Sequence, residues 1–177
     1  MAMPKKVCSS QRIAIIGAGA VGSTIAYTMM LKNLASEVIL IDVNETKEAG
    51  EVMDIADALS FVETGCVRGA DFKDAASADI IIVTAGAPQK PGETRMDLVD
   101  KNKTILKSIF KKVGKIKKST IVVIVSNPVD VLTYVAQEIT GLPQNQVFGT
   151  GTSLDTARLQ NTLAHQLGVN AQNIGGY

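Results

Sequence analysis

The feature that most restricts the fold of this chain is a glycine-rich turn between an apolar strand and a helix. The run from Arg12 to Gly17 has the composition of a buried strand, and helical periodicity extends from about Val21 to Asn33. Between them the sequence reads Gly17-Ala18-Gly19-Ala20-Val21-Gly22. Three glycines at this spacing occur often by chance, but their position between a strand and a helix is typical of dinucleotide-binding folds.

Each glycine of the turn has a distinct mechanical role. Gly17 allows the tight turn, Gly19 lets a pyrophosphate approach the backbone, and Gly22 lets the helix pack closely on the strand. The amino end of the helix, at Ala20 and Val21, offers N–H groups and a positive dipole end to phosphates. The turn therefore predicts a site for a dinucleotide.

An acidic residue completes this pattern. Asp42 lies twenty residues after Gly22, at the end of the second predicted strand, Ser36 to Val43. Its carboxylate can accept hydrogen bonds from the ribose hydroxyls and repels a 2′-phosphate, so we expect NAD as the cofactor in preference to NADP. The alternative, a glycine-rich turn in an unrelated α/β protein, does not account for all parts of the pattern together.

The rest of the chain continues the alternation of strands and helices. The further predicted strands are Cys66 to Gly69, Asp79 to Ala85, Thr120 to Ser126 and Gln146 to Gly149. The further predicted helices are Lys47 to Leu59, Met96 to Lys115, Val129 to Ile139 and Ser153 to Leu167. Apolar strands separated by helices favour a parallel sheet covered on both faces. Right-handed crossovers then close it as a doubly wound, six-stranded α/β sheet, the Rossmann fold.

Charge and composition restrict the partners. Lys and Arg number 18 and Asp and Glu 17, so the net charge of +1 gives no field that attracts nucleic acid. The one dense basic run, Lys107 to Lys118, alternates with apolar residues, which favours the wet face of an amphipathic helix over a patch for an anionic ligand. Two cysteines and one histidine are too few for a zinc site, and we expect no bound metal.

The sequence also predicts the compartment. No apolar run approaches the roughly 18 residues of a membrane span, and the first ten residues lack the apolar core of a signal peptide. We therefore expect a cytoplasmic protein with no membrane partner.

Four motifs occur in a fixed order along the chain. They are Ile15-Ile-Gly-Ala-Gly-Ala-Val-Gly22, Thr84-Ala-Gly-Ala-Pro-Gln-Lys-Pro-Gly-Glu-Thr-Arg95, Ser126-Asn-Pro-Val-Asp130 and Gly149-Thr-Gly-Thr-Ser-Leu-Asp-Thr-Ala-Arg158. With these motifs the chain resembles the amino-terminal part of the lactate and malate dehydrogenase family. The resemblance implies an oxidoreductase of glycolysis that transfers hydride between NAD and a small 2-hydroxy acid, with lactate and pyruvate as substrates. For the full-length enzyme it implies a homo-oligomer, a dimer or a homotetramer.

The resemblance also implies roles for single residues. Arg158 corresponds to the bidentate clamp for the substrate carboxylate. Arg95 lies in the loop that closes over substrate in this family, where its charge polarises the keto oxygen. Asn127 donates to the substrate and to the nicotinamide ribose. Further cofactor contacts are implied for Thr84, Ala85, Gly86 and Val125. The alternatives are a surface salt bridge for Arg95 and a simple Asn-Pro turn at Asn127.

Gln89 predicts the substrate. Relatives that act on malate carry arginine at this position, where it pairs with the second carboxylate, and relatives that act on lactate carry glutamine. A neutral glutamine facing a dicarboxylate leaves a charge unpaired in a closed pocket, so the resemblance favours lactate. Malate remains the alternative substrate.

One part of the family pattern is missing. The general acid and base of the family is a histidine in a Gly-Glu-His-Gly-Asp motif, which does not occur in this chain. The one histidine, His165, is expected to have a surface or packing role. Asp155 orients the catalytic imidazole in the family and has no such partner here.

We therefore expect residues 1–150 to form the NAD-binding domain and residues 151–177 to be the truncated start of the substrate domain. Turnover by this chain alone is not expected. The alternative to an L-lactate dehydrogenase with its remainder supplied elsewhere is an NAD-binding module without turnover.

Overall fold

The protein is built on a six-stranded, all-parallel sheet. The computed structural model describes residues 11–62, 65–88 and 91–176, apart from the side chain of Arg95. Its strands are β1 (Arg12–Ile16), β2 (Glu37–Ile41), β3 (Cys66–Gly69), β4 (Ile80–Val83), β5 (Ile121–Ile124) and β6 (Val147–Gly149). They lie in the order β3-β2-β1-β4-β5-β6, and each neighbouring pair is parallel. The predicted doubly wound Rossmann fold is confirmed.

Five α-helices connect or follow these strands within the described residues. They are α1 (Ala20–Leu31), α2 (Glu45–Ala58), α3 (Arg95–Val113), α4 (Val129–Thr140) and α5 (Ser153–Leu167). Short 3-10 turns lie at η1 (Leu59–Phe61), η2 (Phe72–Ser77), η3 (Gln144–Gln146) and η4 (Ala171–Asn173). The helix predicted from Met96 to Lys115, α3, ends two residues earlier than expected, because Gly114 follows Val113 with a φ of 78° and stops the helix.

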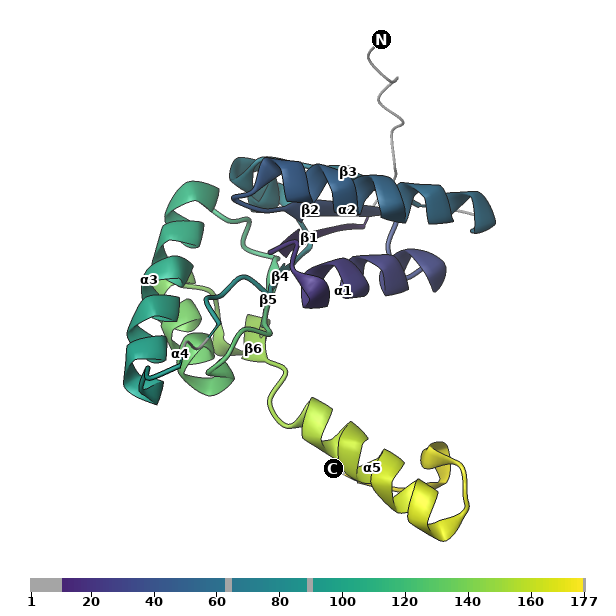
Figure 1. The fold of residues 1–177 in the computed structure, drawn as a ribbon. Coiled ribbons are helices and arrows are strands. Elements are labelled where there is room, and N and C mark those ends of the chain that lie inside the picture. Colours follow the sequence, from purple (N-terminus) through teal and green to yellow (C-terminus); the bar gives the residue numbers. More distant parts are fainter. Residues whose placement is uncertain (1–10, 63–64, 89–90, 177) are drawn as a thin grey trace.

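The alternation of side chains along each strand produces two cores. Ala14 and Ile16 of β1 face α3, α4 and η2, where they pack among the buried residues Leu106 and Leu132. Ile13 and Ile15 face the opposite layer, which α1 and α2 form. Figure 1 shows α3 and α4 beside each other and α1 and α2 on the other side of the strands. Strands that are apolar on both faces are explained by this double cover.

The basic run is solvent-exposed along most of α3. Lys107, Lys111 and Lys112 are exposed, while Ile109 and Phe110 between them are buried. This arrangement confirms the predicted amphipathic helix. Lys115, Lys117 and Lys118 follow the helix.

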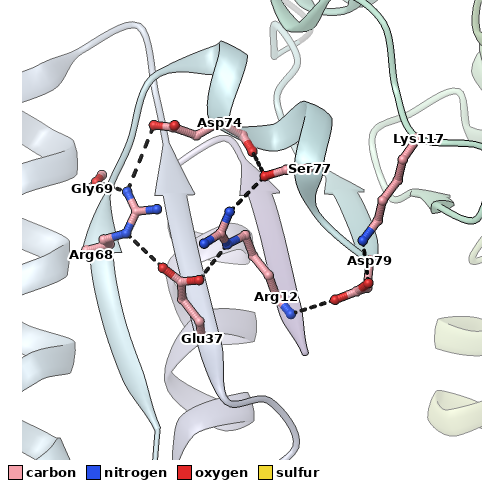
Figure 2. A network of polar contacts seen from close by, with 8 residues as sticks. All are labelled: Arg12, Glu37, Arg68, Gly69, Asp74, Ser77, Asp79 and Lys117. Carbon is pink, nitrogen blue, oxygen red and sulfur yellow. Dashed lines mark hydrogen bonds and ion pairs between the residues drawn. The ribbon is translucent and has the colours of Figure 1, made fainter. Parts of the chain in front are cut away.

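A charged network joins the strands where they begin (Figure 2). The buried Glu37 carboxylate of β2 accepts hydrogen bonds from Arg12 Nε at 2.5 Å and from Arg68 Nε at 2.9 Å, so it links β1, β2 and β3. Beside it, Asp79 accepts from the Arg12 backbone N–H at 2.9 Å and from Lys117 Nζ at 2.5 Å. Burial raises the pKa of the Glu37 carboxyl, but the hydrogen bonds and charges of the two arginines outweigh it, and the pKa lies below its usual range.

This network predicts a pH-dependent stability. Because the folded pKa of Glu37 is lowered, its contribution is complete above its ordinary pKa and is lost as the pH falls through the lowered value. Glu37→Gln should therefore reduce the free energy of unfolding by about 1–3 kcal/mol at neutral pH. The difference from the wild type should shrink as the pH falls towards about 3, as measured by urea unfolding across that range. The exposed Glu138→Gln on α4 is the matched control, and an equal loss at every pH would contradict the charged-pair explanation.

Helix α5 extends away from the sheet and packs mainly against η4 (Figure 1). Its bounds agree with the predicted helix, and Ala164 is its one buried residue. Leu154, Leu159 and Leu167 are each more than half exposed.

Within the described ranges, no helix is both long and apolar enough to cross a membrane. The same residues hold no group of three or more His, Cys, Asp or Glu side chains that could bind a metal ion.

Candidate functional site

A cavity beside the glycine turn, called here the glycine-turn cavity, lies where the central strands end. It has a volume of about 410 Å³ and is bordered by segments that follow three strands: Gly17 and Gly19 after β1, Asp42 after β2, and Thr84 to Gly86 after β4. The carboxyl edge of a doubly wound sheet is where such folds bind their ligands. The structure thus brings together six residues that the sequence assigned to one cofactor.

Two glycines of the turn are required by close contacts. Gly17 has a φ of 116°, and a Cβ there would lie 2.6 Å from the Ala85 backbone nitrogen. A Cβ on Gly22 would lie 1.8 Å from the Gly17 carbonyl oxygen. Gly17 is therefore explained by backbone conformation and contact, and Gly22 by the close approach of α1 to the turn.

The third glycine has no such explanation within the protein. Gly19 is the N-cap of α1 with an ordinary φ of −76°, and a Cβ there would meet nothing within 4 Å. It borders the open cavity, and no side chain caps the helix. A bare backbone beside uncapped N–H groups fits the pyrophosphate of a dinucleotide. The turn fits the group that the sequence predicts.

Asp42 is part of the wall of this site and also holds the turn in place. Its Oδ2 accepts a hydrogen bond from the Ala18 backbone N–H at 2.7 Å, and its Oδ1 accepts from Asn44 N–H at 2.9 Å. Each carboxylate oxygen has a second lone pair, which leaves capacity for ribose hydroxyls. The residue is half-buried at the end of β2, as its predicted position requires.

The segment after β4 supports the turn from the other side. The Thr84 hydroxyl donates to the Gly17 carbonyl oxygen at 2.9 Å, and Ala85 N–H donates to the Ile16 carbonyl oxygen at 2.9 Å. Gly86 is exposed at the cavity. Val125 is half-buried beyond the end of β5 and packs against the α1–α2 core.

Comparison with known sequences decides the family. Residues 11–149 match the family described as lactate/malate dehydrogenase, NAD binding domain. The chain belongs to the lactate/malate dehydrogenase family. Its match to the NAD-binding domain confirms NAD as the cofactor of this domain.

Relatives of the family support this assignment along nearly the whole chain. The L-lactate dehydrogenase of Acetivibrio thermocellus is 47% identical over 167 residues, which are 94% of this chain and 53% of that protein. An L-lactate dehydrogenase of Clostridium botulinum is 44% identical over 96% of this chain and 53% of its own length. The crystal structure of the minor L-lactate dehydrogenase from Enterococcus mundtii has a TM-score of 0.89 and 41% identity, over 95% of this chain and 54% of that one. The chain spans about half the length of the curated relatives it matches.

Of the four residues that the family resemblance assigns to substrate, Arg95, Asn127 and Arg158 lie within the described residues. Gln89 lies outside the described residues. Arg95 is the first residue of α3, after an N-cap at Thr94 whose hydroxyl accepts from Asp97 N–H at 3.2 Å. Asn127 is exposed after β5, and the peptide bond that joins it to Pro128 is cis.

Arg158 and Asp155 lie on α5 and pair with each other. Arg158 Nη1 is 3.4 Å from Asp155 Oδ1, and the two side chains are 68% and 73% exposed. Neither borders the glycine-turn cavity. His165 is exposed in the last turn of the same helix, which agrees with its predicted surface role.

One residue that the sequence analysis missed connects both loops of the site. Asn102 of α3 is only 3% exposed. Its Oδ1 accepts from Ala87 N–H at 2.7 Å, and its Nδ2 donates to the Asn127 carbonyl oxygen at 2.7 Å. It thereby joins the segment after β4 to the segment after β5. A polar residue on the apolar stripe of α3, four residues before Leu106, is the signal that could have identified it.

A second missed residue is Glu48 of α2. Its carboxylate accepts hydrogen bonds from the backbone N–H groups of Asp42 and Ala70, at the ends of β2 and β3. The sequence holds no signal for this contact, because β3 and α2 meet only through the fold.

Proposed function

We propose that this chain is the cofactor-binding half of an NAD-dependent L-lactate dehydrogenase. The observation that carries the proposal is the single cavity shared by the glycine turn, Asp42 and the segment after β4. It is supported by relatives over nearly the whole chain that are named L-lactate dehydrogenases. In this proposal residues 1–150 are the NAD-binding domain, and residues 151–177 begin the substrate domain.

The residues of the turn would hold the cofactor in a defined order. The backbone at Gly19, Ala20 and Val21 would bind the pyrophosphate at the amino end of α1. Asp42 would accept hydrogen bonds from the adenosine ribose, on the side of the cavity that Val43 borders. Gly86 borders the cavity after β4, and we assign the nicotinamide to the space beyond it, near Asn127.

Bound NAD supplies or accepts the hydride of the reaction. The protein must then recognise a carboxylate, polarise a ketone and exchange a proton. We assign the first task to Arg158, whose planar guanidinium can bind a carboxylate with two hydrogen bonds. Arg95, with help from the Asn127 amide, would stabilise the negative charge that develops on the keto oxygen. Asp155 would orient the imidazole of the family's catalytic histidine, which this chain lacks, and would stabilise its positive charge while it exchanges the proton.

The assignment of Arg158 predicts a selective loss of substrate binding. In a chimera that continues this chain with the carboxyl-terminal half of the Acetivibrio thermocellus enzyme, Arg158→Lys should raise the KM for pyruvate at least about 100-fold, because lysine cannot form the paired bonds. The NADH dissociation constant should stay within about twofold. Steady-state kinetics and NADH fluorescence titration measure the two effects. The neighbouring exposed Asn161→Ala is the control, and parallel weakening of pyruvate and NADH would refute the clamp.

Gln89 supports lactate rather than malate as the substrate. Its neutral amide has no charge to offer a second carboxylate, and an unpaired carboxylate in a closed site is costly. The same chimera should oxidise lactate faster than malate, and the opposite preference would reject this use of Gln89.

A module that binds NAD without turnover is the second candidate. The exposed pair of Arg158 and Asp155, on a helix that extends away from the sheet (Figure 1), supports it. The protein from its native source would then have the 18.7 kDa mass of this chain and would bind NADH without lactate-dependent reduction of NAD, whereas a full-length mass with activity would support the dehydrogenase. For the full-length enzyme we propose a cytoplasmic homo-oligomer, consistent with exposed apolar side chains such as Met53 and Phe61.

A further inference from the structure

The carboxylate of Glu48 contacts the backbone of Asp42. Its Oε2 accepts from the Asp42 backbone N–H at 2.7 Å, and its Oε1 accepts from the Ala70 backbone N–H at 3.2 Å. Asp42 in turn accepts from Ala18 N–H in the glycine turn at 2.7 Å. A continuous chain of contacts therefore runs from β3 through Glu48 and Asp42 to the turn.

The neighbouring backbone leaves room for this carboxylate. A Cβ on Gly69 would lie 2.3 Å from Glu48 Oε1, so a larger residue at position 69 would displace the side chain. Glu48 is half-buried, and its two oxygens are directed to two backbone donors. These two hydrogen bonds fix the position of the carboxylate, unlike that of a side chain that is free in solvent.

No cation neutralises Glu48 among the ion pairs of the described residues. Burial raises the pKa of its carboxyl, and the negative charges of Asp42 and Glu45 add to this rise, while the two backbone hydrogen bonds oppose it. The donors that hold it are N–H groups, which favour the ionised form. Glu48 thus adds a second, partly desolvated negative charge beside Asp42.

This charge faces the space next to the predicted ribose position. A second cavity of about 640 Å³ adjoins the first and is bordered by both Asp42 and Glu48. Its charged lining consists of the acids Asp42, Glu45, Glu48, Asp71 and Asp74 and the bases Arg68 and Lys112. Arg68 is already paired with Glu37 and Asp74, and Lys112 lies over the Phe72 ring at 4.7 Å.

We propose that Glu48 is a second specificity determinant of the cofactor site, which acts with Asp42 to exclude dinucleotides that carry a 2′-phosphate. A ribose held at Asp42 brings a 2′-phosphate into the field of both carboxylates. That phosphate carries nearly two negative charges at neutral pH, and the partly buried position of Glu48 reduces the screening of the repulsion. NAD has no charge at this position, so Glu48 should reduce the affinity for NAD only slightly.

The test compares Glu48→Gln with the wild-type 177-residue chain in fluorescence titrations with NADH and NADPH. The variant should reduce the ratio of the NADPH to the NADH dissociation constant by about five- to thirtyfold. Its NADH dissociation constant should change by less than about threefold. Glu45→Gln removes an equal charge from the exposed part of the same wall and is the matched control, with an expected change of about twofold or less.

Further measurements separate the effect of the Glu48 charge from the effect of its hydrogen bonds to the backbone. Glu48→Asp keeps the charge and should keep most of the discrimination. Raising the salt from about 20 mM to about 500 mM should lower the ratio more in the wild type than in Glu48→Gln, because salt screens the repulsion. If Glu48→Gln does not fold, Glu48→Ala is the second neutral variant. In it, among the described residues, only the Asp42 N–H loses this acceptor without another one, because the Ala70 N–H also donates to the Leu40 carbonyl oxygen.

An unchanged ratio in the neutral variants, or parallel weakening of both cofactors, would overturn the proposal and leave Glu48 with a purely structural role. The same conclusion follows if Glu48→Asp loses discrimination as fully as Glu48→Gln. Failure of the wild type to bind NADH would instead contradict the assignment of the cofactor site itself.

Discussion

Replacing Gly22 with alanine should destabilise the fold, whereas the same change at Gly19 should leave the fold intact and strongly weaken cofactor binding. A Cβ at Gly22 meets the Gly17 carbonyl oxygen at 1.8 Å and Thr84 Oγ1 at 2.7 Å, so α1 has to move away from the turn. We expect a loss of about 3–5 kcal/mol in the free energy of unfolding. At Gly19 the same methyl meets nothing in the protein, so the loss of stability should stay below about 1 kcal/mol.

The effect of the Gly19 change should appear in cofactor binding. A methyl at Gly19 occupies the space through which the pyrophosphate approaches the backbone, and we expect NADH affinity to fall about 100-fold. Denaturant unfolding and NADH titration measure the two effects separately. Gly50→Ala in the middle of α2 is the control, because a Cβ there also meets nothing and alanine is the better helix former. Wild-type NADH affinity in Gly19→Ala would show that the pyrophosphate lies elsewhere.

Removal of the Asn102 side chain should be the second large effect. Asn102→Ala removes a buried side chain and leaves the partly buried Ala87 N–H and the Asn127 carbonyl oxygen without this partner. We expect a loss of about 2–4 kcal/mol in the free energy of unfolding, because two hydrogen bonds that join the segments after β4 and β5 are lost and space is left at a buried position. The segments after β4 and β5 should also exchange their amide hydrogens faster, which mass spectrometry can measure.

Asn102→Asp provides a sharper form of the same test. The aspartate can still accept from Ala87 N–H, but its ionised form cannot donate to the Asn127 carbonyl oxygen. Burial next to a carbonyl oxygen raises the pKa of such a carboxyl, so the variant should gain stability relative to alanine as the pH falls and the group becomes a donor. The exposed Asn161→Ala is the control. Wild-type stability of Asn102→Ala would contradict the bridging role.

The elements of this fold could be predicted because their signals are local. Apolar strands and periodic helices are encoded in neighbouring residues, and β3 and α5 have the bounds expected from the sequence. Other strands are shorter than expected, since residues at their ends take on other tasks. Thr84, for example, follows β4 and holds the Gly17 carbonyl oxygen instead of extending the strand.

The partners of single side chains were harder to predict because they are distant in sequence. Asp42 was expected to bind a ribose, but its additional bond to Ala18 N–H depends on how β1 and β2 align. The contact of Glu48 with Ala70 likewise depends on the β2–β3 pairing. Asn102 had a local signal, a polar residue on an apolar stripe, but its two partners become visible only once β4 and β5 lie side by side.

Because all strands of the sheet run in the same direction, the residues at their beginnings and the residues at their ends lie at opposite edges. All strands begin near the edge where Glu37 joins Arg12 and Arg68, and all end near the edge where Asp42 and the glycine turn border the cavity. A substitution at the first edge should alter the stability of the fold alone. At the second edge Gly22 and Asn102 also support the fold, whereas Gly19 faces the cavity and meets no other part of the protein. Variation in cofactor preference can therefore accumulate at the positions of the second edge that border the cavity without supporting the fold.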